Sequence, residues 1–305
     1  MVNPKKLKYP IILDGGLSNV LEAQGCDLNH KLWSAKMIIN NPEAIVKTHL
    51  SYLEAGAACI TTSSYQATVA GFMDLGATKS EAEKLLLLSV ALAEEARSTF
   101  LNQNKNNDPI YIAASIGPYG AFLADGSEYK GKYSLSEEAL ESFHLKRIKV
   151  LETSNADFLA FETIPSLVEI KILSKILMKS TKSSWVSFSC KDAHHLNDGE
   201  KISDAAKLLA HHPTVFAIGV NCTAPQYISE IIQTLKTSAP DKRIIVYPNS
   251  GEVYDVNTKS WSGISDPDVF QKMAIEWLES GADILGGCCR IGPDHIRKIN
   301  TVINS

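Results

Sequence analysis

Three of the six cysteines in the sequence end apolar, strand-like segments, and they are the strongest candidates for chemistry. Cys222 ends one such segment, and Cys288 and Cys289 end another. Thiolate sulfur is a soft ligand that suits Zn²⁺, and three protein ligands leave the fourth tetrahedral position open for a substrate. Gly286 and Gly287 precede the paired cysteines and allow the backbone to bend, so that both thiols face one ion. The pattern predicts one zinc ion per chain; the alternatives are core packing or a redox pair at Cys288 and Cys289.

The other cysteines and the paired histidines lack such a grouping. Cys26, Cys59 and Cys190 have no thiol partner in the pattern, so we interpret them as packing residues. The pairs His194-His195 and His211-His212 resemble metal ligands, but the first lies in a polar segment and the second at a predicted helix end. We therefore expect solvated-loop and helix-terminus roles for them.

Two carboxylates, Asp14 and Glu162, also follow strand-like segments. They favour either a general acid and base pair or a clamp for a substrate ammonium group, and the structural alternatives are helix capping and pairing with a lysine. Hydroxyl groups of Thr62 and Ser64, together with backbone N–H groups of Gly15-Gly16, are candidates to hold a substrate carboxylate. An open zinc site beside such a clamp suits an amino acid that carries a thiol.

These residues require a scaffold that brings distant segments together, and the periodicity of the sequence indicates one. Short apolar, β-rich runs alternate with longer amphipathic stretches along the whole chain. The predicted strands are 11–13, 58–62, 110–115, 158–162, 185–190, 215–221, 244–248 and 284–287. The predicted helices are 42–55, 79–100, 136–153, 166–180, 202–211, 225–235, 267–280 and 293–302.

Eight apolar strands, each followed by a helix, are typical of a closed parallel α/β barrel, the (β/α)8 or TIM barrel, whose site lies at the carboxyl ends of the strands. An open doubly wound sheet is the alternative. The first strand is followed by Asp14-Gly15-Gly16, which matches neither a dinucleotide fingerprint nor a phosphate loop. We predict a single barrel domain over residues 1–305, in which the long segment 117–134 is a lid or binding loop.

The amino-acid composition excludes several classes of protein and of binding partner. The 305 residues include 45% apolar and 21% charged residues, as in an ordinary globular protein, which excludes disorder and disulfide scaffolds. A formal charge of −4 gives no electrostatic support for a nucleic-acid or membrane partner. No secretion signal or membrane-spanning run is visible, so we expect a cytoplasmic protein with reduced cysteines.

The candidate residues lie in motifs that resemble, in order, those of the zinc-dependent homocysteine S-methyltransferases. The resemblance implies a (β/α)8 barrel with Zn²⁺ on Cys222, Cys288 and Cys289. It also implies that homocysteine is the acceptor, with Asp14 and Glu162 on its amino group, Thr62 near the substrate and Asn221 beside the metal. The motifs are Asp14-Gly15-Gly16, Thr62-Ser63-Ser64-Tyr65-Gln66-Ala67, Phe161-Glu162-Thr163-Ile164-Pro165, Gly219-Val220-Asn221-Cys222-Thr223, Tyr247-Pro248-Asn249-Ser250-Gly251-Glu252 and Gly286-Gly287-Cys288-Cys289-Arg290.

The resemblance is greatest to the branch that uses S-methylmethionine as methyl donor, with methionine as the product. The barrel occupies nearly the whole sequence, so we expect a small donor rather than one delivered by a cobalamin or folate module. S-adenosylmethionine is expected to be a weaker donor. The alternatives are betaine as the donor, a selenol such as selenohomocysteine or selenocysteine as the acceptor, and a zinc-binding barrel without catalysis. A monomer is mildly preferred because no extension follows the last predicted helix.

Overall fold

The protein forms a parallel barrel of eight strands. The computed structural model describes residues 2–304 apart from 29–32, 105–107, 256–259 and 263–264. The barrel strands are β1 (Ile11–Ile12), β2 (Cys59–Thr61), β3 (Tyr111–Ile116), β4 (Phe158–Ile164), β5 (Ser184–Phe188), β6 (Val215–Asn221), β7 (Arg243–Tyr247) and β10 (Ile284–Leu285). They pair in the order β1-β10-β7-β6-β5-β4-β3-β2, and a parallel bridge between Leu13 and Cys59 joins the two ends of this sheet. The predicted (β/α)8 fold is confirmed.

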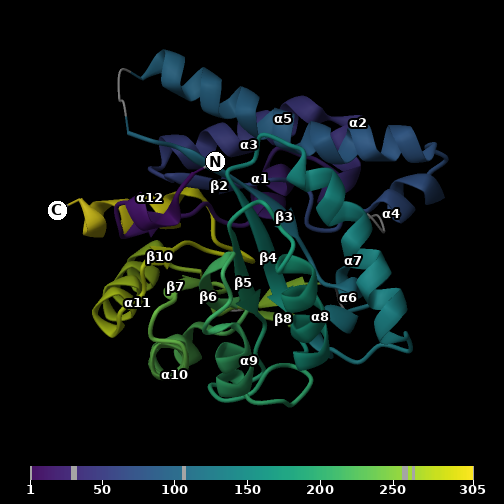
Figure 1. Cartoon of the computed structure of the whole chain (residues 1–305). Coiled ribbons are helices and arrows are strands. Elements are labelled where there is room, and N and C mark those ends of the chain that lie inside the picture. The colour runs from purple at the N-terminus through teal and green to yellow at the C-terminus, as the bar shows by residue number, and fades with distance from the viewer. Residues whose placement is uncertain (1, 29–32, 105–107, 256–259, 263–264, 305) are drawn as a thin grey trace.

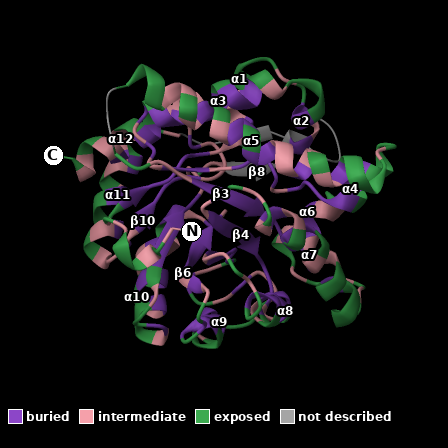
Figure 2. Ribbon diagram, turned by 45° about the horizontal axis from the view of Figure 1, so that its top comes forward, coloured by how far each residue is buried: buried purple, intermediate pink, exposed green. Residues whose placement is uncertain are grey.

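Helices surround the barrel on its outer side (Figures 1 and 2). The eight helices expected from the sequence are present, with ends that differ by a few residues because capping geometry, rather than periodicity, decides where a helix stops. They are α3 (Pro42–Glu54), α5 (Lys79–Gln103), α7 (Glu137–Glu152), α8 (Leu167–Leu177), α9 (Ile202–Leu209), α10 (Ile228–Ser238), α11 (Pro267–Ser280) and α12 (Pro293–Ile303).

Local signals explain where these helices begin and end. The Asn41 side chain accepts a hydrogen bond from Ala44 N at the start of α3, where Pro42 needs no donor partner. Thr78 and Glu81 form a capping box at the start of α5. Gly281 ends α11 in the left-handed region with φ +104°, which a side chain would disfavour. The chain then turns directly into β10.

Two apolar clusters stabilise the barrel. Inside it, alternate strand residues such as Phe158, Ala160, Trp185 and Ile245 pack against one another. The opposite faces of the strands pack against the helices in a larger cluster. All seven residues of β4 are buried, which accounts for the continuously apolar runs in the sequence.

Several short elements of the structure were not predicted from the sequence. They are α1 (Leu17–Ala23), α2 (Met37–Asn40), α4 (Val69–Asp74), α6 (Tyr119–Leu123), the hairpin β8 (Val253–Asp255) and β9 (Ser260–Ser262), and the 3-10 turns η1 (Pro4–Lys6), η2 (Trp33–Lys36), η3 (Ser127–Tyr129) and η4 (Pro225–Tyr227). Most span two turns or fewer, which is too short for hydrophobic periodicity to mark them. The predicted loop 117–134 therefore contains α6 and η3, and the predicted helix 225–235 starts with η4.

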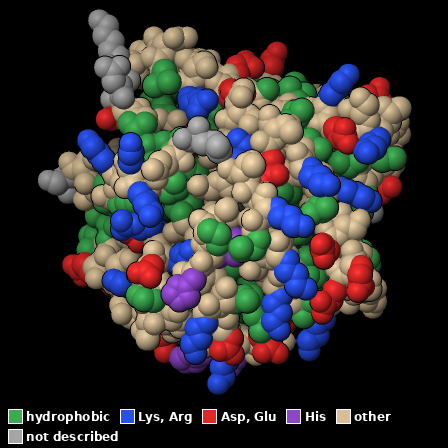
Figure 3. All heavy atoms as spheres, in the orientation of Figure 1, with side chains coloured by type: hydrophobic (Ala, Val, Ile, Leu, Met, Phe, Trp, Pro, Cys, Tyr) green, Lys and Arg blue, Asp and Glu red, His purple; other side chains and the backbone are tan. Residues whose placement is uncertain are grey.

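On the face shown in Figure 3, basic and acidic side chains are interspersed. Among the described helices, none is both long and apolar enough to cross a membrane.

Candidate active site

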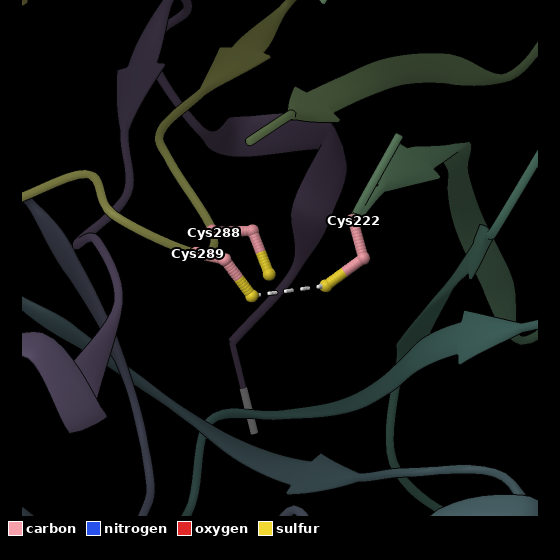
Figure 4. Close-up of side chains that lie close together, drawn as sticks. All are labelled: Cys222, Cys288 and Cys289. Carbon is pink, nitrogen blue, oxygen red and sulfur yellow. Dashed lines mark hydrogen bonds between the residues drawn. The ribbon is translucent and has the colours of Figure 1, made fainter. Parts of the chain in front are cut away.

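The structure brings the three predicted ligand cysteines together. Cys222 follows β6 and Cys288 and Cys289 follow β10, with β7 paired between these two strands. Their Sγ atoms all lie within 4.8 Å of one another, and those of Cys222 and Cys289 are 4.0 Å apart (Figure 4). Four thiolates around a tetrahedral zinc with Zn–S bonds of about 2.3 Å lie about 3.8 Å apart, so the spacing fits such an ion.

The thiols are electrostatically coupled. Hydrogen bonds with Cys222 and Cys289 lower the pKa of Cys288, whereas the contacts with Cys288 and Cys289 raise the pKa of Cys222. Asn221 Nδ2 also approaches Cys288 Sγ at 3.9 Å. Without a cation, the first thiol to ionise opposes ionisation of the next, which is the condition that a divalent metal relieves.

The backbone is strained around this cluster. Cys222 has φ +46°, Arg290 has φ +66° and Thr163 has φ +60°, a region that residues other than glycine rarely adopt. Gly286 and Gly287 act differently from our prediction, because neither adopts positive φ. A Cβ atom on Gly287 would lie 2.0 Å from a side-chain carbon of Ile291, so these glycines serve close packing rather than a bend.

The two predicted carboxylates face the same end of the barrel. Asp14 is only 4% exposed and accepts hydrogen bonds from Thr61 N at 2.7 Å and from Thr61 Oγ1 at 3.1 Å. Glu162 is 7% exposed and accepts a short hydrogen bond from the Ser115 hydroxyl. The register between β4 and β5 shifts between Phe161 and Ile164, so Glu162 lies in a bulge at the strand end.

Both carboxyl groups have raised pKa values. Burial is the main cause for Asp14, opposed by the hydrogen bond from Thr61 N and reinforced by the charge of Glu162. Burial raises the pKa of Glu162 to about 7, opposed by the hydrogen bond from Ser115 and reinforced by the charge of Cys288. None of the ion pairs among the described residues includes either carboxylate. A substrate ammonium group would compensate this buried negative charge.

The remaining predicted substrate residues are tied into the scaffold. The hydroxyls of Thr62 and Ser64 are 2.6 Å apart; Ser64 donates to Ser115 O, and Thr62 accepts from Ser115 N. A Cβ on Gly15 would lie 2.4 Å from Ile291 O. The N–H group of the adjacent glycine, residue 16, donates to that same carbonyl and is therefore not available to a substrate. A direct substrate contact by Gly15, Thr62 or Ser64 stays a prediction.

Asn221 connects the metal cluster to β4. Its Oδ1 accepts from Thr163 N at 2.7 Å and its Nδ2 donates to Thr163 Oγ1 at 2.8 Å. This pair of hydrogen bonds fixes the strained Thr163 beside Glu162, while the same amide approaches Cys288.

The other predicted residues lie outside this cluster. Cys59 belongs to the barrel interior, Cys190 belongs to the outer cluster, and Cys26 packs against that cluster. His195 pairs with Asp192 in the segment 191–200, as expected for a polar loop.

Several site residues were not predicted from the sequence. They include Thr61 and Ser115, which hold the carboxylates, and Tyr247, whose pKa is raised by burial and by the charge of Glu162. Tyr52 donates to the carbonyls of Gly16 and Ile291 and thereby joins the loops after β1 and β10. For Thr61, Ser115 and Tyr247, the position at or near a strand end was the available signal, but no residue type marked them. Tyr52 lies on α3, where no such signal was present.

Comparison with known proteins decides the family. Residues 11–303 match the homocysteine S-methyltransferase family. This chain belongs to the homocysteine S-methyltransferase family. It is 47% identical over 296 residues to homocysteine S-methyltransferase YbgG of Bacillus subtilis, covering 95% of this chain and 94% of that protein.

Other members of the family extend the comparison. The metallated form of the Escherichia coli homocysteine methyltransferase MmuM superposes with a TM-score of 0.87 at 39% identity, covering 98% of this chain and 97% of that one. A selenocysteine Se-methyltransferase of Brassica oleracea is 42% identical, covering 95% of this chain and 87% of that protein. The expectation of a methyltransferase acting on homocysteine is therefore confirmed, and the alternative of a barrel without catalysis is wrong.

Proposed function

We propose that this enzyme transfers a methyl group from S-methylmethionine to homocysteine at one zinc ion held by Cys222, Cys288 and Cys289. The observation that carries the proposal is the convergence of three thiols, within 4.8 Å of one another, beside two buried carboxylates. Three sulfur ligands, on the loops after β6 and β10, suit zinc and leave one position for a substrate. The metallated form of MmuM supports a metal at this place.

When bound, zinc would keep an acceptor thiol ionised at neutral pH. The chain itself binds and orients the acceptor. Asp14 and Glu162 are proposed to bind the ammonium group of homocysteine, which would offset their mutual repulsion and lower their raised pKa values. Gly15, Thr62 and Ser64 are proposed to shape the wall near its carboxylate, and Asn221 to hold Cys288 and Thr163 in place.

The bond changes balance without a redox partner. The carbon–sulfur bond between the methyl group and the donor sulfonium breaks while a bond from that carbon to the homocysteine sulfur forms. The electron pair of the broken bond stays on the donor sulfur, so S-methylmethionine and homocysteine yield two methionine molecules and the proton lost from the thiol. Positive charge on the donor is consumed in the transfer, so an anionic site favours the encounter, and the barrel contributes proximity and alignment.

A selenol acceptor is the second candidate. The similarity to a selenocysteine Se-methyltransferase favours it, because that relative is as similar to this chain as several homocysteine enzymes. Selenocysteine has one methylene fewer than homocysteine, so the distance from the thiols to Asp14 and Glu162 would decide between the two acceptors. S-adenosylmethionine is proposed as a weaker donor and betaine as a poorer one.

Methionine formation from homocysteine tests the proposal with S-methylmethionine, S-adenosylmethionine and betaine, each with and without a chelator. We expect S-methylmethionine to be fastest and the chelator to abolish turnover. Betaine faster than both sulfonium donors would refute the donor assignment.

Metal analysis tests the ligand assignment. Serine in place of Cys222, Cys288 or Cys289 should remove stoichiometric zinc and activity, while Cys26→Ser serves as the matched control because its thiol lies outside the cluster. Full zinc and activity in all three variants would contradict the assignment.

A further inference from the structure

The segment 117–134, between β3 and α7, crosses the carboxyl end of the barrel toward the cysteines. Its turn η3 lies near the ends of β4 and β5, because Ser189 Oγ donates to Glu128 O at 3.5 Å and Gly131 packs against Pro165 O. Gly120 lies so close to Glu128 that a Cβ there would be 2.3 Å from Glu128 N. The segment is therefore folded back on itself and placed by contacts with the barrel.

A buried polar network anchors this segment. Glu169 on α8 accepts hydrogen bonds from His144 Nε2 at 2.7 Å, from Tyr119 N at 2.8 Å and from the Tyr133 hydroxyl at 3.1 Å. Arg147 donates to the carbonyl of Gly117 and to His144 Nδ1. Burial lowers the pKa of His144, so the neutral ring accepts from Arg147 and donates to Glu169. Both ends of the segment are thus tied to α7 and α8.

Hydrogen bonds link the anchored segment to the residues around the thiols. Ser189 Oγ contacts both Glu128 O and Thr163 O, and Asn221, which precedes Cys222, is hydrogen-bonded to Thr163. Tyr129 is 49% exposed, so its ring is accessible to a ligand. Glu128 Oε2 is buried and has no hydrogen-bond partner, and burial raises the pKa of this carboxyl.

Tyr65 completes the group from the loop after β2. Its backbone carbonyl accepts from Gly117 N at 3.0 Å, and its ring packs where a Cβ on Gly117 would lie. Burial raises the pKa of Tyr65, reinforced by the charges of Cys222 and Glu128. Tyr65, Glu128 and Tyr129 thus come from the loop after β2 and from segment 117–134, whereas a hydrogen bond from Gly287 N to Asp14 O at 3.0 Å links the acceptor clamp to the loop of Cys288 and Cys289.

We propose that Tyr65, Glu128 and Tyr129 form the subsite that receives the cationic methyl donor. Two electron-rich rings and a carboxylate with an unpartnered buried oxygen are the groups that recognise a sulfonium, through cation–π attraction and charge pairing. These three residues are distinct from the proposed acceptor clamp, Asp14 and Glu162, so the donor and the acceptor would be bound by different groups. This inference rests on the proposed function, because it assumes a sulfonium donor.

Calorimetric binding to the zinc-loaded enzyme tests the subsite with S-methylmethionine and methionine, which differ by one methyl group and the positive charge on sulfur. Glu128→Gln should weaken S-methylmethionine binding about tenfold, as expected for loss of a charge-assisted contact, and change methionine binding less than twofold. Tyr129→Leu should weaken it about threefold to thirtyfold, whereas Tyr129→Phe, which keeps the ring, should stay close to wild type.

Steady-state kinetics provides the second measurement. Glu128→Gln should raise KM for S-methylmethionine about tenfold and leave KM for homocysteine unchanged. Tyr111→Phe, at the opposite end of the barrel where β3 begins, is the matched control and should behave as wild type. Equal affinity of wild type and Glu128→Gln for S-methylmethionine, or equal weakening of S-methylmethionine and methionine, would overturn the subsite.

Different results would refute the proposed function and the donor subsite. A wild-type enzyme that binds S-methylmethionine but forms no methionine from homocysteine refutes the proposed function, while the calorimetric comparison still decides the subsite. If Glu128→Gln does not fold, as judged by its melting curve, the pair Tyr129→Leu and Tyr129→Phe decides: equal affinities for S-methylmethionine overturn the subsite.

Discussion

Replacing Glu169 with alanine would remove the centre of the network that anchors segment 117–134. The side chain is fully buried, and its loss leaves His144 Nε2–H, Tyr119 N–H and the Tyr133 hydroxyl without their acceptor. Arg147 reaches Glu169 only through His144, to whose Nδ1 it donates. Each unpartnered buried group costs about 1–3 kcal/mol, so the loss of three acceptor contacts costs at least about 3 kcal/mol. We expect Glu169→Ala to lower the free energy of unfolding by about 4 kcal/mol.

This loss is readily measured. An unfolding entropy of about 2.1 cal/mol/K per residue converts 4 kcal/mol into a decrease in Tm of about 6 °C for 305 residues. Differential scanning calorimetry gives Tm, and urea unfolding gives the free energy. Glu169→Gln keeps one acceptor oxygen and should lose less than half as much, and Glu141→Ala on the exposed face of α7 is the surface control. A Tm for Glu169→Ala within 1 °C of wild type would refute the reasoning.

Three further outcomes are expected. Because burial raises the pKa of Glu162 to about 7, the carboxylate that attracts the substrate ammonium is lost as pH falls through this value, so KM for homocysteine should rise below about pH 7 and Glu162→Gln should flatten that dependence in steady-state assays. Gly219→Ala would place a Cβ 1.6 Å from Ile245 O and should separate β6 from β7, with a loss of at least about 2 kcal/mol in urea unfolding; a neutral effect would contradict the packing. Removing the metal should lower stability by about 4 kcal/mol relative to enzyme with free zinc at a thousandfold excess over its Kd, and unchanged melting curves with and without chelator would exclude a bound metal.

The sequence predicted the features whose residue pattern is compatible with only one fold. Eight apolar runs separated by amphipathic stretches indicated the closed barrel, and the strand order then brought Cys222 next to Cys288 and Cys289. The residues that hold these groups were not predictable in the same way. Thr61 and Ser115 act through single hydrogen bonds across neighbouring strands, and such contacts depend on register, which periodicity does not specify.

The structure of segment 117–134 was also only partly predictable from the sequence. Its length and its glycine and tyrosine content suggested a binding loop, but α6 and η3 are too short to be recognised from periodicity. Its anchor residues, His144, Arg147 and Glu169, lie on helices whose patterns indicate only which face is buried. A charged residue on a buried face was the available signal, and it gave no indication of the partner.

The seam of the barrel, where β1 lies between β10 and β2, has a consequence for dynamics. The strands β1 and β10 contain two residues each, and β1 meets β2 through a single bridge from Leu13 to Cys59. Backbone hydrogen bonds from Leu13 N to Leu285 O and from Ala58 N to Ile12 O close the barrel here. The loops after β1 and β10 carry Asp14, Cys288 and Cys289. Opening of the seam would therefore disassemble the acceptor clamp and two of the proposed metal ligands together. Amide hydrogen exchange at 11–13 and 284–287 should slow when metal and homocysteine bind. Both ligands bind the closed form of the barrel and thereby lower the population of the open form.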